Sequence, residues 1–214
     1  MDPQDYSLQS FKGGYDNNLT YLVNCSRTRE QFLVDAAVAP KEIKPFITGR
    51  NLYLFITHTH GDHIAFVREY IEAWPQLVIC MYHKSIHPSK YPESVPLKHG
   101  DIHKVGKLYI KSIYTPGHFH DSMCFLMAGI IFTGDTLFVG RTGRTVYKGG
   151  DTRMLYKSIE KILSMPGNTI IYPGHDYGEK PYITLEENIQ ISPLLRAGNE
   201  NDFLKRMAEY ESGR

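Results

Sequence analysis

The chain has 214 residues, of which 42% are hydrophobic and 22% are charged, and its formal net charge is +1. This length suits one domain with a sizeable core, and the balanced charge gives no reason to expect nucleic acid or an acidic membrane surface as a partner. The longest apolar run, residues 123–132, is about half as long as a membrane span. The first residues lack the basic and apolar regions of a secretory signal. We therefore predict no membrane partner and a cytoplasmic location.

Three cysteines are present, Cys25, Cys80 and Cys124. They are far apart, odd in number and without CxxC spacing, which is typical of a reducing compartment. We expect three buried, unreactive thiols.

The first half of the chain predicts short strands with one helix. Apolar residues at helical spacing predict a helix over residues 64–74, which ends at Pro75. The proline- and lysine-rich residues 85–96 predict a surface loop. The strands expected here, from runs of β-branched, aromatic and leucine residues, are residues 19–24, 31–35, 52–56 and 77–81.

The second half predicts further strands and three helices. Asp151 can cap a helix whose apolar face is Leu155, Ile159, Ile162 and Leu163 and which stops at Pro166. Thr184 and Glu187 have capping-box spacing for a second helix, and Asn201 or Asp202 could cap a third. The strands expected here are residues 108–114, 123–133 as a pair that turns at Ala128 and Gly129, and 169–172. This mixture of strands and helices predicts an α/β sandwich.

Five histidines and two aspartates occur where predicted strands end. Loops at strand ends gather at one edge of a sheet, where ligand-binding residues commonly lie. Imidazole and carboxylate groups together suit zinc, iron or manganese, so the pattern predicts a metal site. The seven residues are His58, His60, Asp62 and His63 in THTHGDH, His118 in TPGH, Asp135 in TGD and His175 in PGH.

The spacing within THTHGDH divides these side chains into two sets. His58 and His60 are two residues apart, so on an extended chain they point the same way. Asp62 and His63 follow a turn at Gly61 and can face a second position nearby. The other five histidines match no comparable pattern and are expected in loops; they are His83, His87, His99, His103 and His120.

The motifs THTHGDH, TPGH, FTGD and YPGHDYG, in this order, resemble those of the metallo-β-lactamase superfamily. The resemblance extends from LVDAA at residues 33–37 to the final helices. It implies an α/β fold of the αββα sandwich type, as a single domain over residues 1–214 with a helical segment from about residue 184 to 214 packed on it.

The resemblance also implies a ligand set and a chemistry. His58, His60 and His118 would hold a first metal ion, Asp62, His63 and His175 a second ion, and Asp135 would bridge the two. The ions would be divalent, with zinc favoured and iron or manganese as alternatives. A hydroxide bridging them would be the nucleophile, and Asp62 could instead act as a proton acceptor. Asp62 and Asp135 are therefore the candidate catalytic residues.

The second half of the chain, from GDTLFVGRTGRTVYKGG to YPGHDYG, is similar to two branches of this family. Glyoxalase II hydrolyses S-acylglutathione thioesters with two metal ions, and persulfide dioxygenase oxidises glutathione persulfide with one iron. In the second branch His58, His118 and Asp135 would form a 2-His-1-carboxylate site. HDY at residues 175–177 and GRT at residues 143–145 favour the dioxygenases. Two positions disagree with that branch: Val146 stands where it usually has an acidic residue after GRT, and Thr59 stands where it usually has alanine or cysteine after the first histidine of the opening motif.

We predict a thioester hydrolase, with the dioxygenase as the second hypothesis and a lactone or β-lactam hydrolase as a further one, since fold does not fix function. A binding protein that has lost the chemistry is disfavoured because all seven ligand residues are present. The substrate would be a small molecule, a glutathione or other thiol derivative. The residues expected to contact it are Arg144, Tyr177, Arg141 and Lys148; the three cations could bind its carboxylates.

Overall fold

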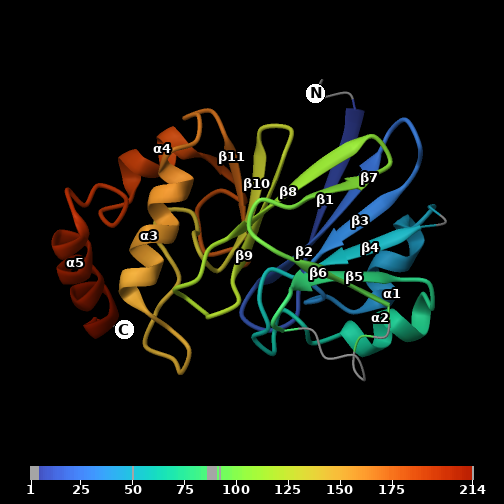
Figure 1. Cartoon of the computed structure of the whole chain (residues 1–214), viewed down its shortest axis with the longest axis horizontal. Coiled ribbons are helices and arrows are strands. Elements are labelled where there is room, and N and C mark those ends of the chain that lie inside the picture. The colour runs from blue at the N-terminus through green and yellow to red at the C-terminus, as the bar shows by residue number, and fades with distance from the viewer. Residues whose placement is uncertain (1–4, 50, 86–90, 92, 214) are drawn as a thin grey trace.

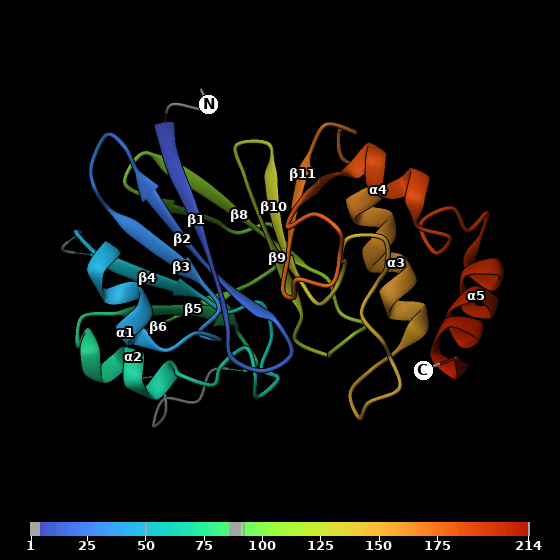
Figure 2. The ribbon, with the colours of Figure 1, turned by 180° about the vertical axis from the view of Figure 1, so that it is seen from behind.

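Two six-stranded sheets face each other, and helices cover the outer face of each (Figures 1 and 2). The computed structural model describes residues 5–49, 51–85, 91 and 93–213. The predicted αββα sandwich is confirmed. Among the described residues, no helix is both long and apolar enough to cross a membrane.

The first sheet is built by the first half of the chain, in the order β1-β2-β3-β4-β5-β6. The strands β1, β2 and β3 are antiparallel, whereas β3 to β6 are parallel. The helices α1 (Pro40–Ile43) and α2 (Val67–Ala73) and the 3-10 helix η2 (Lys44–Phe46) accompany this sheet. Its strands are β1 (Tyr6–Gly13), β2 (Asn18–Cys25), β3 (Gln31–Val34), β4 (Leu52–Phe55), β5 (Val78–Tyr82) and β6 (Ser94–Leu97).

The second sheet has the order β12-β11-β10-β9-β8-β7, and only its β10–β11 pair is parallel. The helices α3 (Thr152–Leu163), α4 (Leu185–Ile191) and α5 (Glu200–Ser212) lie on its outer side (Figure 1). Its strands are β7 (Ile102–Val105), β8 (Leu108–Tyr114), β9 (Met123–Met127), β10 (Ile130–Gly134), β11 (Ile170–Pro173) and β12 (Ile183–Thr184).

Three apolar clusters hold these layers together. The central one lies between the sheets, where Phe32, Phe55, Phe125 and Phe132 pack in edge-to-face contacts. A second cluster joins the first sheet to α1 and α2, and a third joins the second sheet to α3, α4 and α5. Burial of such aromatic area is the main source of stability in a sandwich of this kind.

The helix caps agree with the sequence in two of three cases. Asp151 accepts a hydrogen bond from the Met154 amide at the start of α3, and Thr184 forms the predicted capping box with Glu187 at the start of α4. The prediction for α5 is wrong. Asn199 is its cap, accepting from the Asp202 amide, because the apolar residues Phe203 and Met207 place the helix start earlier.

Four further elements that differ from the prediction are α2, β6, β1 and β7. The helix predicted over 64–74 begins only at Val67, because successive turns at residues 61–66 carry the chain away from THTHGDH. Ser94–Leu97, expected in a loop, is the edge strand β6, where Pro96 is tolerated because it pairs on one side only. Residues 86–90 and 92 of that predicted loop lie outside the described residues. The strands β1 and β7 were not predicted, since their exposed positions weaken the apolar pattern.

Candidate metal centre

All seven predicted ligand residues meet at one edge of the sandwich, where β4, β8, β10 and β11 end. Their nitrogen and oxygen atoms form three overlapping groups, and within each group these atoms lie within 4.8 Å of one another. The groups are His58 with His60 and His118, Asp62 with His63 and His175, and His58 with His63 and Asp135. We call the first two the first triad and the second triad.

The first triad consists of three imidazoles. Nδ1 of His60 lies 3.0 Å from Nε2 of His58 and 2.9 Å from Nε2 of His118. Nδ1 of His118 donates to the Arg144 carbonyl at 2.7 Å. Nε2 of His118 is then unprotonated, and its lone pair faces His60. Burial lowers the pKa of His118. Burial also lowers the pKa of His60 to about 4, together with electrostatic repulsion from His118. Burial and the charge of His63 hold the pKa of His58 well below its usual range. These imidazoles are neutral at pH 7, the form that binds metal ions.

The second triad contains ion pairs. Oδ2 of Asp62 lies 3.3 Å from Nε2 of His175 and 3.7 Å from Nε2 of His63. Burial opposes a charge on these histidines, but their carboxylate neighbours outweigh it. The Asp135 and Asp35 carboxylates hold the pKa of His63 well above its usual range, and hydrogen bonds to Asp135 and Asp62 raise the pKa of His175 to about 9.

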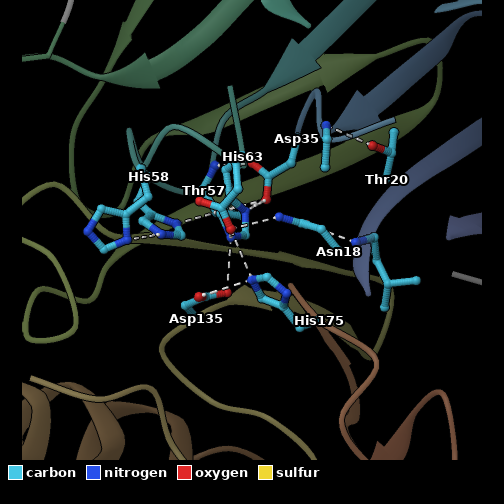
Figure 3. A network of polar contacts seen from close by, with 12 residues as sticks. Asn18, Thr20, Asp35, Thr57, His58, His63, Asp135 and His175 are labelled. Atoms are coloured by element: carbon cyan, nitrogen blue, oxygen red, sulfur yellow. Dashed lines mark hydrogen bonds and ion pairs between the residues drawn. The ribbon is translucent and has the colours of Figure 1, made fainter. Parts of the chain in front are cut away.

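Asp135 contacts histidines of both triads, and Figure 3 shows its carboxylate beside the His175 ring. Its Oδ2 is 3.5 Å from Nε2 of His118 and 3.4 Å from Nε2 of His175, and its Oδ1 is 3.2 Å from Nε2 of His63. Burial alone would raise its pKa, but the charge of His63 and the hydrogen bond to His175 hold it well below its usual range. The carboxylate is therefore ionised and reaches both triads.

The donor set fits divalent metal ions. Nε2 of His63 and Oδ1 of Asp135 are buried and face each other at 3.2 Å as an ion pair, but neither atom makes a hydrogen bond to a described residue. Buried polar atoms without a hydrogen bond call for an explanation, and a bound ion is one. Clustered imidazole and carboxylate groups match the preferences of zinc, iron and manganese. Gly174 keeps the space open, because a Cβ there would lie 2.4 Å from Oδ1 of Asp135 and 2.8 Å from Cε1 of His63.

Three polar residues that support the centre were not predicted. Asp35 at the end of β3 is 2% exposed and accepts from Nδ1 of His63 and from the amide and hydroxyl of Thr57, each at 2.7 Å. Asn18 donates to Asp62 at 3.0 Å, and the Asp16 carbonyl accepts from Nδ1 of His175 at 2.8 Å. Asp35 had a usable signal, because an aspartate follows β3 in LVDAA just as Asp135 follows β10.

A cavity of about 1080 Å³ opens over the centre. The four predicted substrate residues line it, together with His60, Asp62, His118, Asp135 and His175. Arg144 donates to the hydroxyl of Tyr147, with its guanidinium 5.1 Å from that ring, and Lys148 is exposed at the rim.

Tyr177 and Arg141 form a stack on the second triad. The Tyr177 ring lies parallel to the His175 ring at 4.9 Å, and its hydroxyl donates to Asp16 at 2.5 Å. The Arg141 guanidinium lies 4.6 Å from the centre of the Tyr177 ring and donates to the Tyr177 carbonyl at 2.8 Å. Both residues thus have structural partners inside the site as well as access to the cavity.

None of the other described histidines and none of the cysteines belongs to these ligand groups. His83, His99 and His120 are in turns as predicted, His103 is in the strand β7 against prediction, and His87 lies outside the described residues. The three cysteines are buried and free, as expected. Burial raises the pKa of Cys80 to about 12 and of Cys124 to about 11, which makes these thiols unreactive.

The two triads should respond differently to pH. A metal ion at the second triad must displace protons from His63 and His175, whereas the first triad is already neutral at pH 7. Lowering the pH from 8 to 6 should therefore lower the zinc affinity of the second triad by about tenfold per pH unit for each proton displaced. The zinc affinity of the first triad should stay nearly unchanged. Zinc titrations of His60→Ala and His175→Ala, which each retain one intact triad, check this. Equal pH dependence in both variants would contradict it.

Comparison with known proteins agrees with this geometry. The sequence profile described as "Metallo-beta-lactamase superfamily" matches residues 14–175. The chain is 29% identical over 193 residues to the hydroxyacylglutathione hydrolase of Francisella philomiragia, covering 75% of each chain. It is 30% identical over 198 residues to the mitochondrial persulfide dioxygenase ETHE1 of Homo sapiens, covering 88% of this chain and 75% of the relative. The crystal structure of ETHE1 from Myxococcus xanthus superposes with a TM-score of 0.82 at 26% identity, covering 95% and 91%.

Proposed function

The chain belongs to the metallo-β-lactamase superfamily, and from this premise we propose that it is a metal-dependent hydrolase that cleaves a thioester such as an S-acylglutathione. The observation that carries the proposal is the presence of two separate triads with Asp135 between them. Two divalent ions bound there would supply a nucleophile from water near neutral pH and polarise the carbonyl of the thioester.

The side chains have distinct tasks in this proposal. His58, His60 and His118 would hold one ion, Asp62, His63 and His175 would hold the other, and Asp135 would be within reach of both. Asp62 also faces the cavity with 22% of its side chain exposed, so it is placed either to bind an ion or to accept a proton from the attacking water. A thiol has a pKa of about 8.5, so the leaving thiolate departs without a strong proton donor.

The rim of the cavity would bind the thiol part of the substrate. Arg144, Arg141 and Lys148 line it and would attract carboxylates such as those of glutathione. Tyr177 would contact the substrate from the side of the second triad. These substrate contacts are proposals that rest on the position of the residues around the cavity.

Replacing Arg144 tests the substrate contacts. Arg144→Ala should raise KM for an S-acylglutathione about tenfold, the equivalent of about 1.4 kcal/mol, and leave kcat within about twofold, because its side chain lies at the rim. Steady-state kinetics measures this. Arg68→Ala, on the exposed face of α2, is the matched control and should change neither constant. An unchanged KM in Arg144→Ala would remove this residue from the site.

A persulfide dioxygenase is the second candidate, favoured by the 30% identity over 88% of this chain to a protein of that name. In that case His58, His118 and Asp135 would hold a single iron and leave positions open for oxygen and substrate. The presence of both triads supports the hydrolase instead.

The deciding experiment is metal content per chain, by elemental analysis of protein purified without added metal, followed by two assays. Two ions per chain together with thiol release from an S-acylglutathione would support the hydrolase. One iron per chain with oxygen consumption on glutathione persulfide would support the dioxygenase. Turnover of lactones or β-lactams alone would reject both in favour of another hydrolase of this family.

A further inference from the structure

His60 differs from the other four histidines of the centre in how it is held. Each of the others has a hydrogen-bond partner on the nitrogen that faces away from its triad. The partners are Thr57 for His58, Asp35 for His63, the Arg144 carbonyl for His118 and the Asp16 carbonyl for His175. His60 points Nδ1 at its triad, and no described residue hydrogen-bonds to its Nε2. Something other than a second-nitrogen partner must therefore fix its orientation.

The segment after His118 supplies two contacts that do so. The Phe119 ring packs on the His60 ring at 4.1 Å with an interplanar angle of 46°. Asp121, two residues further on, binds the residue before His60: Oδ1 accepts from the Thr59 amide at 3.2 Å and Oδ2 accepts from the Thr59 hydroxyl at 2.6 Å. Both contacts reach the THTHGDH loop from the loop that carries His118.

Asp121 is built as a fixed acceptor. Its side chain is 1% exposed, and Oδ2 also accepts from the Ser85 hydroxyl at 2.5 Å. No described cation pairs with it. A buried carboxylate that is held by neutral donors alone has little freedom to move, because losing any donor leaves it poorly solvated. It thus ties together the loops that follow β4, β5 and β8.

We propose that Asp121 is a positioning residue. Through its hydrogen bonds to Thr59 it fixes the position of the His60 imidazole, and so it raises the affinity of the first triad for its metal ion. The proposal rests on the proposed metal centre. Thr59 stands between His58 and His60, so the two hydrogen bonds fix the backbone from which both imidazoles project. The second triad receives no contact from Asp121 and does not depend on it.

The expected result is a selective loss of metal affinity. Partners that orient a metal ligand from outside typically contribute 10–100-fold to affinity. Asp121→Ala should weaken zinc binding at the first triad by about that factor and leave the second triad unchanged. Thr59→Val, which removes one hydroxyl and keeps Asp121, should weaken zinc binding at the first triad less. Thr59→Ser should retain the original affinity because it keeps the hydroxyl.

The test uses the full chain, stripped of metal and titrated with zinc against a chelator. Each substitution is made in His175→Ala, which leaves the first triad, and in His60→Ala, which leaves the second. Titration with cobalt, whose visible spectrum reports coordination geometry, adds a readout that does not depend on activity. Ser85→Ala is the matched control, since it removes a bond to Asp121 without touching Thr59, and it should have the smallest effect. The melting temperature of each zinc-free variant reports any general loss of stability.

The proposal is supported if Asp121→Ala lowers zinc affinity only in the His175→Ala protein, which keeps the first triad, and if Thr59→Ser leaves that affinity unchanged. Unchanged affinity in both Asp121→Ala and Thr59→Val overturns it. Equal weakening of both triads, in step with a lower melting temperature of the zinc-free protein, also overturns it, because Asp121 would then act only on the fold. Failure of the original chain to bind zinc at either triad would instead reject the metal centre itself.

Discussion

Replacing Asp135 by alanine is expected to lower kcat/KM for thioester hydrolysis by at least about 10³-fold, or about 4 kcal/mol. Its two oxygens lie within 3.5 Å of histidines from both triads, so the substitution removes a carboxylate that reaches both ion positions. Elemental analysis should show fewer than two ions per chain. His58→Ala should have a loss of similar size, because it removes a ligand of the first triad.

The fold should survive both substitutions, since these side chains stand at the edge of the sandwich and outside the apolar clusters. Circular dichroism and the melting temperature of the metal-free proteins check this. Asp176→Asn is a suitable control, because this aspartate pairs with Lys12 at the surface and lies next to His175 without belonging to a triad. Full activity of Asp135→Ala with its metal gone would refute the metal-dependent hydrolase.

Asp35→Asn is the second substitution with a large expected effect. The carboxylate accepts from His63 and twice from Thr57 while almost fully buried, so an amide would turn a donor toward at least one of these donors. Breaking such a buried pair typically destabilises a protein by about 3–5 kcal/mol. The φ angle of +60° at this position is one that asparagine also tolerates, so the variant isolates the effect of the charge from that of the backbone.

Chemical denaturation of the metal-free protein measures the loss of stability, and zinc titration measures a weaker second triad. Asp176→Asn again serves as control, with an expected change below about 1 kcal/mol because its ion pair is exposed. A variant that unfolds at the same denaturant concentration as the original chain, with unchanged zinc binding, would show that Asp35 is not a support of His63.

The sequence predicts which seven residues meet at this edge of the sandwich because each of them follows a strand. Each of β4, β8, β10 and β11 has an apolar core face, and the residue after the strand end is fixed once the strand register is fixed. The same reasoning does not identify Asp16, in the β1–β2 turn, or Asn18, the first residue of β2, although both contact the second triad. Their role depends on how the two sheets dock, and no local pattern encodes that.

The directions in which side chains around the cavity point also cannot be predicted from the local sequence pattern. The glycine-rich loop after β10 places Arg141 against Tyr177 and Arg144 against Tyr147, although both arginines carry the same charge in the same segment. The start of α5 shows a smaller failure of the same kind. Asn199, Asn201 and Asp202 are all good caps, and only the packing of Phe203 and Met207 into the apolar cluster that α5 shares with α3 selects the first of them.

The hydrogen bond from His175 to Asp16 joins residues that are 159 positions apart in the chain. A contact of such long sequence separation forms late in folding, after the large loop between its partners has closed. During synthesis, THTHGDH leaves the ribosome more than a hundred residues before His175, and a histidine-rich peptide can capture ions on its own. Ions held by the unfolded chain reduce the stabilisation that metal gives to the native state. Refolding should therefore be cleanest when metal is withheld until the two sheets have docked.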